Sequence, residues 1–252
     1  MRTGYEFDAT EWLRRWDVQQ EGYVPDREDM FALMFDVVER LGAAPGRLLD
    51  LACGPGSLAR RALGRFPGAD VVAVDFDPVM LELGRRTAGE GVHWVDADLA
   101  RPDWTGMVGD GRFDAAVSAT ALHWLAADDV PGLASALAGV LRPGAVFVDF
   151  DTVLADPASP RLAAMTKDLR VARTEARTGT SGFEDFRAWW DALAAEPALA
   201  ELFADRERRF AGRTPSGGNS LPVWESALRK AGFAEVGTVT QLLDRRMLVA
   251  IR

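Results

Sequence analysis

The segment LLDLACGPGSLARR, residues 48–61, joins an acidic residue to a short glycine loop. Asp50 ends an apolar run, and Gly54 and Gly56 allow the backbone to turn tightly and to approach a ligand closely. A helix beginning near Ser57 would add free N–H groups and the positive end of its dipole. Glycine pairs also occur in plain turns, so this loop alone leaves both a cofactor site and a simple turn open.

Two more carboxylates follow the next apolar runs. VVAVDFDP places Asp75 about 20 residues after Gly56, where an acid in a dinucleotide fold holds a ribose diol. VHWVDADLA places Asp98 just beyond the following run. Each aspartate alone could cap a helix or face solvent. Acids at the ends of three successive strands, however, predict a ligand site at one edge of a sheet.

His123 and Asp151 are the candidates for a general base. They follow the fourth and fifth apolar runs, and imidazole titrates near neutrality. The alternatives are a packed core histidine and a loop carboxylate. His93 lies within a strand and is expected to be structural, and Cys53 is expected to be a small packed residue. Because these residues lack metal-ligand spacing, we predict no metal site.

The elements that would position these residues alternate along the chain. Strands are predicted at 47–51, 71–75, 92–95, 114–119 and 145–149, helices at 26–41, 57–66, 78–86 and 130–141, and a turn at 142–144. This alternation predicts an α/β fold with a doubly wound, Rossmann-like, mostly parallel sheet. Two closing strands, 235–242 and 247–251, are joined by 244–246 and must pair antiparallel. A helix is expected over 223–231.

A helical pattern interrupts the sheet pattern late in the chain. We therefore expect a core of residues 1–155 and 221–252, with 1–27 as an N-terminal lid, and a helical cap insertion over 156–220. The cap would end in the loop RTPSGGNS, 213–220. Its aromatic residues could line an acceptor pocket or form the cap's own core; they are Phe183, Phe186, Trp189, Trp190 and Phe203.

Residues 45–150 resemble the class I S-adenosylmethionine (SAM)-dependent methyltransferases, and the closing strand pair extends the resemblance. The family loop reads acid-x-G-x-G-x-G; here it runs from Asp50 to Gly56 with Ala52 in place of the first glycine. The resemblance implies that Asp50, Ala52 and Gly54 lie near the methionine part of SAM. It also implies that Asp75 binds the ribose hydroxyls.

The same resemblance assigns the adenine end of the site. It implies that Phe76 packs beside the adenine, that Asp98 accepts from the adenine amino group and that Leu99 flanks the ring. FDAAVSATALHWL, residues 113–125, looks like the fourth family motif, whose Ala119 and Thr120 would line the methyl donor.

The opening WDVQQEGYVPDREDMF and the stretch TALHWL are similar to a group of bacterial small-molecule methyltransferases. In that group the N-terminal segment folds over the cofactor, which implies that Gln19, Gln20 and Tyr23 close the site. The alternative is that Trp12, Trp16 and Tyr23 only pack a helix onto the core.

Composition narrows the partners. The net charge of -9 disfavours nucleic acid, and the basic run 206–209 is expected to be a solvated helix face. One cysteine excludes an internal disulfide and fits a reducing compartment. With no signal-peptide pattern and no long apolar stretch, we expect a cytoplasmic protein without a membrane partner, as a monomer or homodimer.

The resemblance implies in-line methyl transfer from SAM to a small-molecule acceptor, with S-adenosylhomocysteine (SAH) as product. We expect an uncharged or weakly polar acceptor; whether O, N or C is methylated stays open. One alternative is an NAD(P)-dependent oxidoreductase, because Gly54-x-Gly56-x-x-Ala59 fits G-x-G-x-x-A. It leaves Asp50 and Asp98 unexplained and lacks a Tyr-x-x-x-Lys pair. A non-catalytic SAM-binding regulatory protein is the other.

Overall fold

The computed structural model describes residues 7–154, 156–179, 182–213 and 220–252. The first residues of the expected lid and most of the expected loop 213–220 lie outside the described residues. Within the described part, no helix has the length and apolar character needed to cross a membrane.

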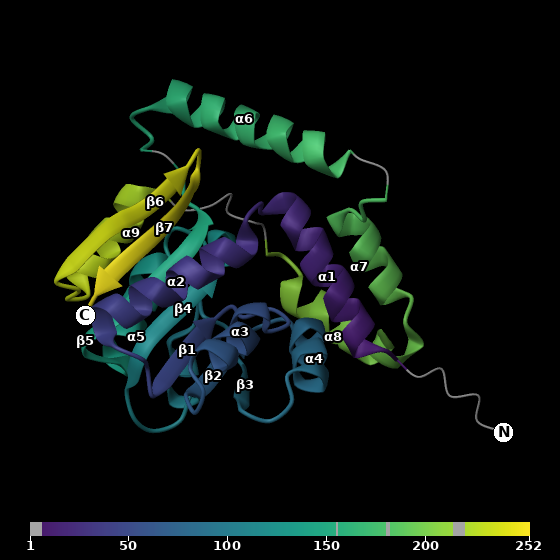
Figure 1. Cartoon of the computed structure of the whole chain (residues 1–252), viewed down its shortest axis with the longest axis horizontal. Coiled ribbons are helices and arrows are strands. Elements are labelled where there is room, and N and C mark those ends of the chain that lie inside the picture. The colour runs from purple at the N-terminus through teal and green to yellow at the C-terminus, as the bar shows by residue number, and fades with distance from the viewer. Residues whose placement is uncertain (1–6, 155, 180–181, 214–219) are drawn as a thin grey trace.

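A seven-stranded sheet forms the centre of the fold (Figure 1). Its order is β3 (Val92–Asp96), β2 (Asp70–Asp75), β1 (Arg47–Leu51), β4 (Phe113–Ala119), β5 (Leu141–Thr152), β7 (Arg245–Ile251) and β6 (Glu235–Leu242). Strands β1 to β5 are parallel, whereas β7 runs antiparallel to both β5 and β6. The predicted fold class is therefore confirmed.

Helices cover both faces of this sheet. Helices α2 (Arg27–Gly42) and α3 (Ser57–Arg65) pack on one face, and α5 (Val130–Val140) and α9 (Leu221–Lys230) pack on the other. Leu48 and Leu49 are both fully buried but belong to opposite apolar clusters. This is the two-residue period of a strand covered on both faces, and it explains the uninterrupted apolar runs in the sequence.

The remaining helices gather on the side of α4 (Pro78–Thr87) (Figure 1). They are α1 (Ala9–Tyr23), α7 (Phe186–Ala194) and α8 (Ala200–Phe210). Trp12 of α1 and Trp189 of α7 pack edge to face at 5.9 Å between ring centroids, in one cluster with Leu83 of α4. Helix α6 (Pro160–Thr178) buries no residue and spans from the β6–β7 hairpin to the start of the α7 segment (Figure 1).

Two predicted turns are wrong in detail. Residues 142–144 belong to β5, which begins at Leu141 and accommodates them through a register shift against β4 and a φ of 80° at Gly144. Residues Arg245 and Arg246 belong to β7, since each pairs with a residue on both neighbouring strands. The hairpin turn is instead made by Leu243 and Asp244, with Leu243 at a φ of 58°.

Candidate functional site

A cavity of about 660 Å³ opens at the carboxyl ends of the parallel strands. The order of the strands reverses between β1 and β4, and ligands in open α/β sheets bind outside such a reversal. The loops after β1 to β5 line the cavity together with α1, α6, α7 and the end of α8. The cavity is large enough for a nucleoside cofactor and a second small molecule.

The loop after β1 is shaped by left-handed backbone conformations. Ala52, Gly54 and Gly56 have φ values of 50°, 55° and 77°. Ala52 and Gly54 line the cavity, and open space surrounds the missing Cβ of Gly54. Gly56 has a different role, because a Cβ there would lie 2.3 Å from the Trp94 ring. Its smallness serves packing against β3 rather than the approach of a ligand.

Asp75 connects the loops after β1 and β2. One carboxylate oxygen accepts from the Gly54 N–H at 2.7 Å and the other from the Asp77 N–H, also at 2.7 Å. Burial raises the pKa of Asp75 to about 6 even though these backbone hydrogen bonds favour the charged form. Asp75 lines the cavity, and each of its oxygens has a further lone pair with which to accept a hydrogen bond.

Asp50 lies deeper in the same wall. Its side chain is buried, and its Oδ2 has no hydrogen-bond partner within the described residues. Burial, reinforced by the charge of Asp75, raises the pKa of Asp50 well above its ordinary value. Because buried polar atoms are normally satisfied, this oxygen points to a ligand donor in the cavity.

Phe76, Asp98 and Leu99 meet at one end of the cavity. An arginine after α8 joins them: Arg213 pairs with the Asp98 carboxylate, and its guanidinium carbon lies 4.2 Å from the Phe76 ring centroid. Asp98 also accepts from the Ala100 N–H at 3.0 Å. The residues expected around the adenine are therefore brought together, with a cation of the same chain against them.

The basic run 206–209 is only in part the solvated face that the sequence suggested, because Glu207 and Arg208 are exposed while Arg206 and Arg209 are half-buried. Arg206 pairs with Asp77 and lies 4.0 Å above the Trp190 ring, and Arg209 pairs with Asp96. These ion pairs connect α8 to the loop after β2 and to the last residue of β3. The prediction failed for Arg206 and Arg209 because a charged run on a helix does not reveal which acids face it in the fold.

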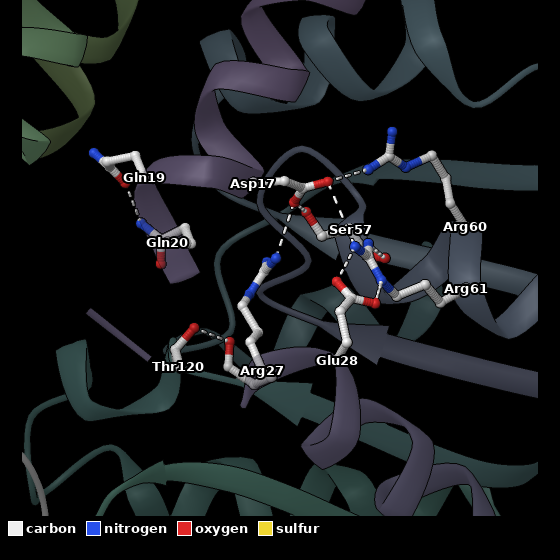
Figure 2. A network of polar contacts seen from close by, with 10 residues as sticks. Asp17, Gln19, Gln20, Arg27, Glu28, Ser57, Arg60, Arg61 and Thr120 are labelled. Carbon is white, nitrogen blue, oxygen red and sulfur yellow. Dashed lines mark hydrogen bonds and ion pairs between the residues drawn. The ribbon is translucent and has the colours of Figure 1, made fainter. Parts of the chain in front are cut away.

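Asp17 of α1 is the centre of a polar network at the start of α3 (Figure 2). It accepts from the Arg27 Nη1 at 2.9 Å and from the Ser57 hydroxyl at 2.7 Å, and Arg60 and Arg61 lie 3.3 and 3.6 Å away. Burial would raise the pKa of Asp17, but these arginines and the Ser57 hydroxyl lower it overall. The network fixes α1 and α2 beside the glycine loop.

Arg27 is the residue of this network that faces the cavity. Its side chain is buried, and its Nε has no hydrogen-bond partner within the described residues. Gln20 and Tyr23 line the cavity beside it, whereas Gln19 is buried and accepts a hydrogen bond from the Gln20 amide. The sequence analysis missed Arg27, because an arginine at the start of a helix is normally read as exposed.

His123 and Asp151 form one unit. The His123 Nδ1 lies 2.7 Å from Asp151 Oδ1, and the His123 backbone N–H donates to Asp151 Oδ2 at 2.8 Å. Asp151 is 3% exposed, while the His123 ring is 30% exposed and lines the cavity. Burial lowers the pKa of His123, but the charge and hydrogen bond of Asp151 outweigh it and raise the pKa overall.

The aromatic residues of the cap divide between two roles. Phe186 and Trp190 line the cavity. Trp189 is fully buried against α1, and Phe203 packs on Trp190 at 6.0 Å between ring centroids. Phe183 packs on Tyr23 at 5.7 Å.

Comparisons with known proteins agree with this geometry. The family model described as a methyltransferase domain matches residues 48–144. The demethylmenaquinone methyltransferase of Thermus thermophilus is 41% identical over 125 residues, which cover 48% of this chain and 52% of that protein. A trans-aconitate 2-methyltransferase of Methylobacterium nodulans is 29% identical over 182 residues, covering 69% and 66%.

The solved structure of DesVI from Streptomyces venezuelae has the same fold, with a TM-score of 0.60, 15% sequence identity and coverage of 98% and 99% of the two chains. The match to the demethylmenaquinone methyltransferase spans about half the length of that relative, whereas the match to the trans-aconitate 2-methyltransferase spans 66%. The fold is therefore the doubly wound, Rossmann-like fold that DesVI also has. Residues 48–144 match a methyltransferase domain, and the similarity to named methyltransferases supports the resemblance to the class I SAM-dependent family.

Proposed function

We propose that the chain transfers a methyl group from SAM to a small-molecule acceptor and releases SAH. The observation that carries this proposal is the convergence of Asp50, Asp75 and Asp98 on one cavity, at the ends of three adjacent strands. The open space at Gly54 and the orphan oxygen of Asp50 fit a ligand with hydrogen-bond donors.

Different residues of the cavity would bind different parts of the cofactor. Asp75 would accept from the ribose hydroxyls, and Phe76 and Leu99 would enclose the adenine. Asp98 would accept from the adenine amino group, since its carboxylate can accept another hydrogen bond beside those from Arg213 and the Ala100 N–H. When bound, SAM supplies a methyl group on a sulfonium sulfur, and transfer leaves the neutral thioether of SAH.

The methionine part of SAM carries a carboxylate and an ammonium group, and the cavity offers a residue of opposite charge for each. Arg27, which lines the cavity and whose buried Nε has no partner among the described residues, would bind the carboxylate, and Asp50 would accept from the ammonium group. Ala52 and Ala119 leave room between these ends. Tyr23, whose hydroxyl accepts from the Phe186 N–H at 3.0 Å, would help to keep water out by joining α1 to the cap.

His123 acts as the general base in this proposal. Asp151 holds the Nδ1 side of the ring and would stabilise the imidazolium that forms when His123 takes a proton from the acceptor. A base of this kind contributes roughly 10²–10⁴-fold to rate. The dyad also argues against the non-catalytic alternative, which rested on the lack of a firm base.

The identity of the acceptor does not carry over from relatives, since one is named for demethylmenaquinone and another for trans-aconitate. The test is SAH formation from SAM over a panel of small acceptors. His123→Gln and Asp151→Asn should each lower turnover by about 10²–10⁴-fold with unchanged SAH affinity. His93→Gln is the matched control, because His93 lies on β3 and is 74% exposed.

Two results would count against the proposal. Full turnover by His123→Gln would remove the base from the mechanism. SAM binding without turnover on any acceptor would favour the regulatory alternative.

A further inference from the structure

One wall of the cavity, formed by the start of β7 and the middle of α6, carries positive charge. Arg170 and Arg245 both line the cavity there. Arg170 is paired, since its Nε donates to both carboxylate oxygens of Asp244 at 2.9 and 2.8 Å. Arg245 instead donates to the Tyr23 carbonyl oxygen, and no carboxylate among the described residues lies within 4.0 Å of its guanidinium.

The surroundings of Arg245 make its charge costly in the absence of an anion. Burial and the charges of Arg170 and Arg177 lower its pKa to about 10, against the attraction of Asp244. The group therefore stays charged at neutral pH. Asp244 and Asp151 attract this charge without forming an ion pair with it, and a ligand anion in direct contact would relieve more of the cost of burial.

Thr174 adds a second, independent feature on the same wall. Thr174 lines the cavity, and its Oγ is buried and has no hydrogen-bond partner in the described part of the chain. A buried hydroxyl normally finds a partner, so this one indicates an acceptor atom that a ligand would bring. Glu175 also lines the cavity, but it is exposed, and solvent and salt screen its charge.

The wall lies next to the base. Arg245 pairs with Thr152 in the ladder between β5 and β7, and Thr152 directly follows Asp151. The charge of Arg170 opposes protonation of His123, which shows that the arginines and the dyad share one electrostatic environment. Because the wall and the dyad line the same cavity, a small molecule in it has access to both.

We propose that the acceptor is a small organic acid whose carboxylate binds Arg245 and the Thr174 hydroxyl, while its proton-bearing atom faces His123. This inference rests on the proposed function and departs from the expectation of an uncharged acceptor. The carboxylate is the recognition group, and the methylated atom is another one, since a carboxylate has no proton for a base to remove.

The test compares acids with neutral isosteres of the same shape. The probes are salicylate, para-hydroxybenzoate and para-coumarate with their primary amides, and calorimetry measures their binding to both free and SAH-loaded protein. In the parent, acids should bind at least tenfold more tightly than amides. Arg245→Gln should weaken the acids by roughly 10- to 150-fold and leave amide and SAH affinities unchanged.

Two further variants make the result specific. Thr174→Val, which keeps shape, should weaken acid binding by roughly 2- to 12-fold. Arg142→Gln is the charge-matched control, because Arg142 lies at the beginning of β5 and is 48% exposed. This variant should leave the affinities for the acids, the amides and SAH unchanged. Thermal unfolding of each variant establishes that it is folded.

Three outcomes would overturn the inference: no acid binds, amides bind as well as acids, or Arg245→Gln weakens both alike. Failure of the proposed function looks different, because SAH would then not bind while the acid subsite could still be measured on the free protein.

Discussion

Replacing Asp75 by asparagine is the sharpest single perturbation of the cofactor site. Both oxygens of Asp75 already accept backbone N–H groups, from Gly54 and from Asp77. An amide offers only one oxygen, so one of these N–H groups loses its acceptor. The ribose loses its charged partner in the same step.

The expected size follows from these lost hydrogen bonds. A hydrogen bond to a charged group contributes about 1.5–3 kcal/mol, so SAH should bind roughly 10- to 150-fold more weakly to Asp75→Asn. The orphaned backbone N–H should lower the free energy of unfolding by about 1–3 kcal/mol. The variant should therefore remain folded, with a lower melting temperature.

Calorimetric titration with SAH and thermal unfolding measure the two effects separately. Asp70→Asn is the matched control: Asp70 begins the same strand at its opposite end, where it pairs with Arg47 and is 40% exposed. It should not change SAH affinity, and its stability should fall by no more than about 1 kcal/mol. If Asp75→Asn bound SAH as tightly as the parent, the assignment of Asp75 to the ribose would be refuted.

Other predictions concern pH, charge and the cap. The pKa of Asp75 is raised from 3.8 to about 6. If binding requires the carboxylate, SAH affinity should be full at pH 7 and fall about tenfold per pH unit below 6, as titrations in a buffer series would reveal. The contribution of Asp75 to folding stability has the opposite sign, being present at low pH and lost as pH rises through 6. Arg27→Gln should weaken SAH binding by roughly 10-fold or more yet leave decarboxylated SAH unaffected; equal weakening of both ligands would contradict a role at the carboxylate. Trp190→Ala should raise the acceptor KM in steady-state kinetics without changing SAH affinity. Trp189→Ala should lower the free energy of unfolding by roughly 3–5 kcal/mol in chemical denaturation. The reverse pattern would contradict the roles given to these two residues.

The sheet and the acidic residues at its edge could be predicted from the sequence because their signals are local. A buried parallel strand is a short apolar run, and the residue that ends it lies at the carboxyl edge wherever the strand sits in the sheet. Asp50, Asp75 and Asp98 could therefore be brought to one site before their contacts were known. His123 and Asp151 could be placed at the same edge by the same argument. Their direct contact could not be predicted, because it depends on the conformations of two separate loops.

The arginines of the cavity could not be predicted in this way. Arg27, Arg213 and Arg245 lie far apart in the sequence, and each is positioned by a partner on another element: Asp17, Asp98 and the Tyr23 carbonyl. The net charge of -9 is a property of the whole chain and gives no information about the local positive charge at one wall of the cavity. The division into core, lid and cap, the cytoplasmic location and the oligomeric state stay predictions.

The central claim is that the cavity at the carboxyl ends of β1 to β4 binds a SAM-type cofactor. Calorimetric titration of the folded chain with SAM, SAH and NADH tests it most directly. We predict binding of SAM and SAH with dissociation constants on the order of micromolar, about -8 kcal/mol, and no heat with NADH. No binding of either SAM or SAH, or tighter binding of NADH, would contradict the account.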